Sequence, residues 1–335
     1  MIIKTMMEDL PIELWLDIFT YLNIQERFNG FFNLNQRINR LLFNYHHHIN
    51  LKNNDENSQF LFEHILPQLP HPQSISSLRL QNINKMNLFK NVKRLHFPYL
   101  KSLTLCCLYI TNDILDLIYF HAHQLEHLNA TLFISSKWNI LLKLILSLPK
   151  LHTCYLHLGI GLCPIKSSIS SISPIKHLTL LGSFQSCCMK NLDVLFSYLP
   201  YLHSLHIECN RLKFTKLIQN QYSNKLLSLS NFSLQINQLP ELFIDLIDFI
   251  TTTMPHIEKL KIKCCTPLKN LVYINVYQWM KAIDLLISLK ELILIITLGT
   301  TIKQQVWNRR IEQLIKFTNM RHITLRIISS TEHKK

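Results

Sequence analysis

The sequence predicts an α/β solenoid, in which short parallel strands alternate with amphipathic helices. One apolar phrase recurs ten times, with apolar residues at its first, fourth and sixth positions. Most intervals between phrases carry apolar residues at helical spacing, and a polar run from Asn53 to Ser58 separates the repeats from a different N-terminal segment. These observations predict two parts, a small helical module and a long repeat array.

The phrase recurs at a nearly constant spacing. Successive first positions lie between 24 and 32 residues apart, and a period of about 20–29 residues is typical of leucine-rich repeats. The phrases are Ile75/Leu78/Leu80, Leu100/Leu103/Leu105, Leu125/Leu128/Ala130, Leu151/Cys154/Leu156, Ile175/Leu178/Leu180, Leu202/Leu205/Ile207, Leu229/Phe232/Leu234, Ile257/Leu260/Ile262, Leu289/Leu292/Leu294 and Met320/Ile323/Leu325.

Each phrase predicts a short strand, because the spacing of two between its last apolar residues matches strand alternation. The intervals predict helices, several of which end before Pro149, Pro200 or Pro255. A helix is wider than a strand, so stacked repeats would curve into a horseshoe with parallel strands on its concave face. An all-helical solenoid is the alternative, but the phrase spacing argues against it. The asparagine or cysteine that commonly ends such a phrase is mostly missing, so the backbone there must be satisfied in another way.

The residues that enzymes use do not occur in the required patterns. The chain has only five glycines, and Gly159-Ile-Gly161 is not continued into a phosphate-binding loop. His123-Gln-Leu-Glu126-His127 matches a zinc-peptidase pattern, but the pattern works only on a helix and here it straddles a strand phrase. Nine cysteines form no C-x-x-C pair, which disfavours structural zinc. We therefore expect no catalytic residue, no metal and no cofactor.

Hydropathy and charge bear on the compartment and the partner. No stretch reaches the roughly 18 apolar residues that a membrane span needs, and the N-terminal residues do not resemble a signal peptide. We therefore expect a cytoplasmic or nuclear protein with reduced cysteines and no membrane contact. The net charge of +14 would suit nucleic acid or an acidic partner. Because the lysines are scattered, nucleic acid is disfavoured as the partner.

The first fifty residues predict three short amphipathic helices. The first follows Leu10-Pro11 and carries apolar residues at spacings of three and four; breaks at Asn23 and from Asn33 to Asn35 separate the next two helices. Three such helices cannot bury enough surface to be stable alone. They require either a partner or the repeats, for which they would form a cap. The predicted boundaries are residues 4–50 for the helical module, 51–58 for the linker and 59–330 for the repeats.

The helical module resembles an F-box, on the stretch Leu10-Pro-Ile-Glu-Leu-Trp-Leu-Asp-Ile-Phe-Thr-Tyr-Leu22 and its continuation to Leu42. That family opens with a Leu-Pro dipeptide, followed by an acidic residue and a run of leucine, isoleucine and phenylalanine. The resemblance implies binding to a Skp-type adaptor and, through it, to the cullin scaffold of a ubiquitin ligase. It also implies an adaptor-facing set, namely Leu10, Pro11, Leu14, Ile18, Phe19 and Leu22.

Three consecutive histidines, His46, His47 and His48, follow the third predicted helix. We place them at the end of that helix. Successive side chains there point about 100° apart and cannot converge on one metal ion.

The polar positions of each phrase face the concave side of the predicted sheet, because the leucines point inward. Parallel strands stack equivalent positions about 5 Å apart, so scattered side chains would form one patch. The candidate substrate-binding residues are His127, Tyr155, His157, His177, His206, Lys259, Lys261 and Lys263. The sequence therefore predicts the substrate-recognition subunit of a Skp-adaptor/cullin/F-box ubiquitin ligase, with an unidentified protein substrate. A leucine-rich-repeat module that binds protein or RNA, unrelated to ubiquitin transfer, is the alternative.

Overall fold

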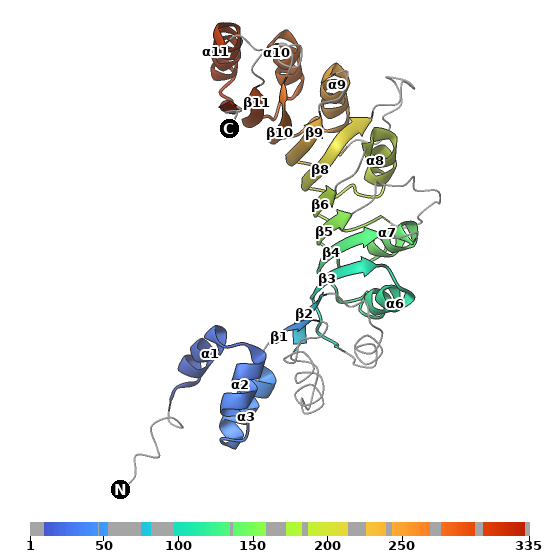
Figure 1. Ribbon diagram of the computed structural model, residues 1–335, viewed down its shortest axis with the longest axis vertical. Coiled ribbons are helices and arrows are strands. Elements are labelled where there is room, and N and C mark those ends of the chain that lie inside the picture. The colour runs from blue at the N-terminus through green and yellow to red at the C-terminus, as the bar shows by residue number, and fades with distance from the viewer. Residues whose placement is uncertain are drawn as a thin grey trace. The chain divides into compact units, whose positions relative to one another are not determined.

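The protein is described by a computed structural model (Figure 1). It describes residues 10–45, 47–52, 75–81, 97–134, 137–158, 172–182, 187–213, 226–238, 243–268, 276–298 and 304–331. The chain divides into two compact units, Met1–Thr131 and Leu132–Lys335.

Three short helices open the first unit, as the sequence predicts: α1 (Ile12–Tyr21), α2 (Ile24–Phe31) and α3 (Gln36–Asn44). Asn23 caps α2 in a reciprocal capping box with Glu26, and the Asn35 side chain accepts the backbone N–H of Ile38 at the start of α3. Each cap satisfies amide groups that the first turn of a helix leaves without a partner. The predicted breaks are therefore the points at which the helices begin.

Aromatic side chains fill the space between these helices. Trp15 and Phe19 of α1 are fully buried and pack with Leu42 of α3. The ring of Phe31 lies 5.4 Å from the ring of Trp15, in an edge-to-face arrangement that favours such pairs. The three helices consequently have a small core of their own.

The histidine run does not continue helix α3. Instead, His47–Lys52 forms strand β1, which pairs in parallel with β2 (Ile75–Gln81). The helical placement of His47 and His48 was wrong because α3 ends at Asn44 and the following residues alternate between the two sides of a strand: His47 and Ile49 are buried and His48 is exposed. The predicted linker begins on β1, and its remaining part, 53–58, lies outside the described residues.

His47 connects the end of α3 to β1. Its Nε2 lies 2.7 Å from the carbonyl oxygen of Leu42, one of the final carbonyls of α3 that lack a helical partner. Since a carbonyl only accepts, Nε2 must carry the proton and donate. The other ring nitrogen, Nδ1, then accepts from the guanidinium of Arg27, 3.5 Å away. This tautomer joins α2, α3 and β1 through one imidazole.

Arg27 is an unusual member of this contact because its side chain is only 7% exposed. Its guanidinium lies 4.5 Å above the ring of Tyr45, an arrangement that attracts a cation to the aromatic face. Burial lowers the pKa of Arg27, and the charges of Tyr45 and Glu26 oppose that shift. The buried cation is thus held by an aromatic ring and an imidazole.

The first unit continues with β3 (Ser102–Tyr109), α6 (Asn112–Phe120) and β4 (His127–Ile134), whose last residues belong to the second unit. Strand β3 pairs in parallel with β2. The zinc-peptidase pattern lies in the turn after α6 and at the start of β4, as predicted. Its Glu126 forms an ion pair with Lys101 at 3.2 Å.

In the second unit, strands and helices follow one another along the chain in the order that the sequence predicts. Its strands β5, β6, β8, β9, β10, β11 and β12 are each paired in parallel with the next, and β7 pairs with β8 outside this series. Figure 1 shows the helices of this unit along one side of its strands. The bounds are β5 (Thr153–Leu158), β6 (His177–Gly182), β7 (Cys187–Cys188), β8 (Ser204–Lys213), β9 (Asn231–Gln238), β10 (Lys259–Leu268), β11 (Glu291–Leu298) and β12 (Thr324–Thr331), with α7 (Trp138–Leu146), α8 (Met189–Phe196), α9 (Phe243–Thr253), α10 (Val276–Leu285) and α11 (Gln304–Met320).

A backbone ladder precedes the strands. The carbonyl of His152, just before β5, accepts the N–H groups of both Lys176 and His177 at 2.9 and 3.0 Å. The carbonyls of Lys176, His203, Ser230 and Glu258 each accept two N–H groups from the following repeat in the same way. This ladder satisfies backbone groups without the usual asparagines. Between β8 and β9, the Asn237 amide also donates to the Asn210 side chain.

The last repeat is displaced from its predicted position. The phrase Met320/Ile323/Leu325 should place Leu325 level with Leu294, but Leu325 pairs with Leu292 and the next inward position is Ile327. Met320 is exposed because α11 extends through it. The register assigned from the sequence was therefore wrong by two residues. The α/β fold with parallel strands is confirmed, and the horseshoe curvature stays a prediction.

The His47 contact yields a stability prediction. Replacing His47 with Ala removes the donor to the Leu42 carbonyl and the acceptor for Arg27, so we expect the free energy of unfolding to fall by about 1–3 kcal/mol. Replacing His48, its exposed neighbour on β1, should change it by less than about 0.5 kcal/mol. Urea unfolding followed by tryptophan fluorescence measures both variants. Equal effects of the two substitutions would contradict the assigned role of His47.

Candidate functional site

The side of the second-unit sheet that faces away from the leucine core carries three rows of side chains. The pairing register sets each row, because residues level with one another on successive parallel strands lie about 4.8 Å apart. The rows are Thr153, His177, Ser204, Asn231, Lys259, Glu291 and Thr324; then Tyr155, Thr179, His206, Ser233, Lys261, Ile293 and Arg326; and then His157, Leu181, Glu208, Gln235, Lys263, Ile295 and Ile328.

The residues predicted to line this surface lie in these rows. None of the seven that belong to the second unit is buried: Tyr155, His157, His177, His206, Lys259, Lys261 and Lys263. The eighth, His127, is exposed at the start of β4 in the first unit. The structure thus brings the seven residues onto one sheet face, as the phrase predicts, while their binding role stays a prediction.

His206 has the most perturbed environment of these histidines. Burial lowers its pKa, the charge of Glu208 opposes this, and Lys261 on β10 lowers it further. The backbone of Ser233, on the strand between them, also hydrogen-bonds the ring and raises the pKa. The net shift favours neutral imidazole, which offers one donor and one acceptor to a partner.

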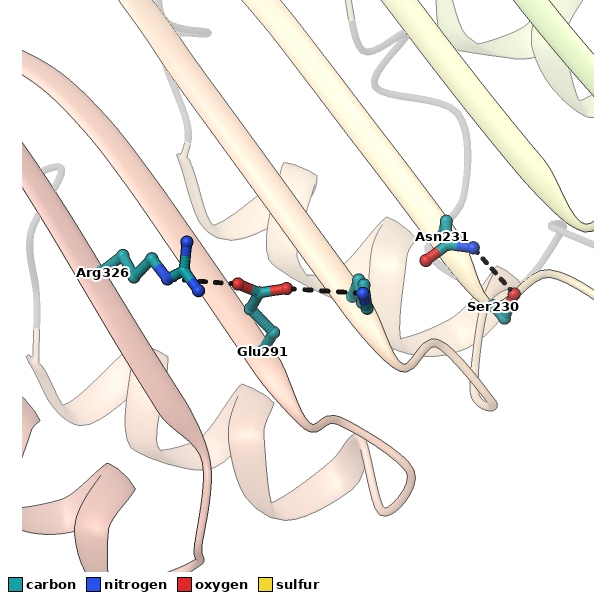
Figure 2. Close-up of polar contacts among 5 residues, drawn as sticks. Ser230, Asn231, Glu291 and Arg326 are labelled. Carbon is teal, nitrogen blue, oxygen red and sulfur yellow. Dashed lines mark hydrogen bonds and ion pairs between the residues drawn. The ribbon is translucent and has the colours of Figure 1, made fainter.

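Lys259, Lys261 and Lys263 follow one another along β10, one in each row. Their surroundings are less uniformly positive than the sequence suggests. Figure 2 shows the carboxylate of Glu291 in contact with the guanidinium of Arg326; the distance is 3.3 Å. The other oxygen of Glu291 lies 3.8 Å from Nζ of Lys259. The protein therefore supplies its own anion to Lys259. Repulsion among the three lysines of β10 does not require an external anion at that position.

Lys261 and Lys263 differ from Lys259 in their neighbours. Level with them on β11 are Ile293 and Ile295, and on β9 are a serine and a glutamine. Among the described residues neither lysine forms an ion pair. Of the three lysines of β10, these are the two whose ammonium groups remain available to a partner.

Sequence reasoning missed the face residues of the last two strands, Glu291, Ile293, Ile295, Arg326 and Ile328. The signal for the first three was present, since they occupy the third, fifth and seventh positions of the phrase that begins at Leu289. Arg326 occupies the seventh position of the phrase that begins at Met320, so its signal was present too, but the incorrect register placed it level with Ile295 instead of Ile293. Ile328 lies beyond that phrase. Ile328 is 55% exposed, so the face becomes partly apolar at this end.

The adaptor-facing residues that the resemblance implies, in and beside α1, occupy different environments. Pro11 and Leu14 are exposed, whereas Leu10, Ile18 and Leu22 are half-buried. Phe19 is fully buried in the helical core and presents no surface to a partner. Further apolar side chains that the resemblance did not include are exposed on the same helix, namely Ile12, Leu16 and Tyr21.

Other site types are not found in the part of the chain that the structure describes. There, no group of three or more histidine, cysteine, aspartate or glutamate side chains is placed to hold a metal ion. No described helix is both long enough and apolar enough to cross a membrane. Of the described cysteines, those at positions 106, 107, 154, 209 and 264 are not in disulfide bonds, and burial raises the pKa of Cys154. Comparison of the chain with family models and with curated proteins gives no match.

The environment of His206 predicts a pH dependence. A lowered pKa means that the unfolded chain takes up a proton before the folded chain does, so this residue's contribution to stability is present above about pH 6.5 and is lost as the pH falls below it. His206→Gln should therefore lose less thermal stability than the wild type between pH 7.5 and 5.5. His177→Gln, an exposed neighbour in the same face, is the control. An equal fall in melting temperature between pH 7.5 and 5.5 for the wild type and for His206→Gln would contradict the prediction.

Proposed function

We propose that this chain is the substrate-recognition subunit of a ubiquitin ligase of the Skp-adaptor/cullin/F-box type. In this proposal the N-terminal helices bind the adaptor and the outward face of the repeat sheet binds a protein substrate. The chain performs no chemistry; it raises the effective concentration of the substrate beside a ubiquitin-charged enzyme. The observation that carries the proposal is the set of exposed apolar side chains on α1.

Helix α1 has more apolar surface than its own core can use. Trp15 and Phe19 complete the packing against the other two helices. Leu14 is nevertheless 46% exposed and Tyr21 is 88% exposed. They lie seven residues apart and so share one side of the helix, two turns from each other. Removing such side chains from water contributes about 25 cal/mol per Å² of apolar area, which supports a partner at this position.

The resemblance of the N-terminal segment to an F-box supplies the class of that partner. Within the adaptor-facing set that the resemblance implies, the exposed members Pro11 and Leu14 lie in and beside α1 with its other exposed apolar residues, and the buried member Phe19 belongs to the helical core. A helix that packs on one side and binds on another needs both kinds of apolar residue. The pattern of the stretch is compatible with this double use.

The sheet face supports the second half of the proposal. Parallel strands in register present side chains in ordered rows, and a rigid surface of this kind loses little conformational entropy when a partner binds. Its central row contains tyrosine, threonine, histidine and serine side chains that can donate or accept hydrogen bonds. This favours a folded or extended protein partner over a small molecule, which would need a concave pocket.

Substitutions on α1 test the adaptor contact. We expect the double variant Leu14→Asp, Tyr21→Ser to retain about thirtyfold less Skp-type adaptor than the wild type, because anchors at the centre of an interface commonly contribute about 2 kcal/mol or more. Neither side chain belongs to the helical core, so the melting temperature should change little. Adaptor retention is measured by affinity co-purification of the full chain followed by quantitative immunoblotting.

The matched control carries the same chemical changes in the second unit, at Leu227→Asp and Tyr201→Ser, both of which are more than half exposed. This variant should bind the adaptor as the wild type does. Failure of the wild-type chain to bind any Skp-type adaptor would overturn the proposal. A repeat protein with no role in ubiquitin transfer would then be favoured.

A further inference from the structure

We propose that strands β10–β12 bind a protein segment that carries acidic and aliphatic side chains within a few residues of one another. The binding surface, here called the β10–β12 patch, consists of Lys261, Lys263, Ile293, Ile295, Arg326 and Ile328. The inference deepens the proposed function, since it names the chemistry of the segment that the sheet face captures.

The pairing register assembles the patch from three strands. Lys261, Ile293 and Arg326 lie level with one another on β10, β11 and β12. Two residues further along each strand, on the same face, Lys263, Ile295 and Ile328 form the other row of the patch. Neighbouring positions in a row are about 4.8 Å apart, and the two rows are about 7 Å apart along the strands. Cationic and aliphatic side chains are therefore interleaved within a small area.

The charge of the patch is not balanced from within. Glu291 is the acidic residue of the face on these three strands, and it already contacts Lys259 and Arg326. Lys261 and Lys263 have no ion-pair partner among the described residues. In the row that contains Lys263, the nearest carboxylate is that of Glu208. It lies two strands from Lys263, which is about 10 Å. An acidic partner would relieve repulsion between the two lysines.

The patch also has an apolar requirement. Ile293 and Ile295 are half-buried, and Ile328 is 55% exposed, on the side of the sheet opposite the leucine core. Elsewhere on this face of the second unit, the equivalent positions are polar apart from Leu181 and Tyr155. A partner that contributed carboxylates alone would leave these isoleucines in water. A partner with aliphatic side chains beside its carboxylates covers them and gains the energy of apolar burial.

These two requirements favour protein over nucleic acid. Phosphates would satisfy Lys261 and Lys263, but they offer nothing to Ile293 and Ile328. The patch contains no aromatic side chain on which an unpaired base could stack. Aliphatic groups flanked by ammonium groups instead match a peptide of mixed acidic and aliphatic composition, because charge complementarity directs encounter and apolar contact adds affinity.

Fluorescence anisotropy with labelled peptides tests the inference on the full chain. The probe is a dodecapeptide of Glu-Glu-Leu-Leu repeats; Glu-Glu-Ser-Ser and Lys-Lys-Leu-Leu dodecapeptides separate the acidic and aliphatic requirements. We expect the Glu-Glu-Leu-Leu peptide to bind about tenfold more tightly than either comparison peptide. A uridine dodecanucleotide tests the nucleic-acid outcome.

Variants assign the binding to the patch. Lys261→Glu with Lys263→Glu should weaken the peptide complex about tenfold, and Ile328→Ser should weaken it about threefold. Glu291→Gln should strengthen binding, because it removes a carboxylate that competes for the same cations. The control, Lys281→Glu with Lys316→Glu, makes the same change in net charge on exposed positions of α10 and α11 and should leave affinity within about twofold. Circular dichroism establishes that each variant is folded.

The outcomes separate this inference from the proposed function. Equal affinity for the Glu-Glu-Leu-Leu and Glu-Glu-Ser-Ser peptides, or an equal loss in the Lys281/Lys316 control, would overturn it. So would tight uridine binding that depends on the two patch lysines and is unaffected by Ile328→Ser. If the peptide does not bind while the adaptor still does, this inference alone fails. If the adaptor does not bind while the peptide does, the proposed function alone fails.

Discussion

The register of the parallel strands is the constraint on which the surface of the second unit depends. Before β5, β6, β8, β9 and β10, one carbonyl accepts two N–H groups from the next repeat, as that of His203 does from Ser230 and Asn231. Because this ladder precedes the pairing of the strands, it aligns every following position across the repeats. Side chains that are about 27 residues apart in sequence therefore become direct neighbours. The chemistry of the sheet face is therefore determined by the residues that occupy the same position in successive repeats.

The same register explains why the charges of the face cannot be judged one strand at a time. On β10 alone, Lys259, Lys261 and Lys263 are three positive charges at alternate positions of one strand. Once β11 is aligned beside it, the first lysine gains Glu291 and the other two gain isoleucines. A shift of β11 by one residue would direct Glu291 into the leucine core, where an unpaired carboxylate is strongly unfavourable. The positions of the ion pairs and of the core leucines are consequently set together.

The repeat phrase predicted the strands, the inward leucines and the outward rows, because alternation in a strand depends on local spacing alone. It did not predict β1, since the phrase has no complete copy around Ile49 and the histidines before it were assigned to a helix. It also misplaced the last repeat. There α11 runs through Met320, which lengthens the interval and moves the inward position from Ile323 to Leu325. The Glu291 contacts depend on three aligned strands, so no single repeat contains the information needed to predict them.

The first unit shows how a helical module can keep apolar side chains exposed and still be attached to the first strand of the sheet. The core of the three helices uses Trp15 and Phe19, and the link to β1 uses Arg27 and His47. Neither set draws on Leu14 or Tyr21. A buried cation held by an imidazole and an aromatic ring is a costly contact by comparison with an apolar one. Its geometry is more specific, however, because the Leu42 carbonyl selects the tautomer that accepts from Arg27. The attachment of the helices to the first strand therefore has a defined orientation, and the exposed side of α1 remains outside it.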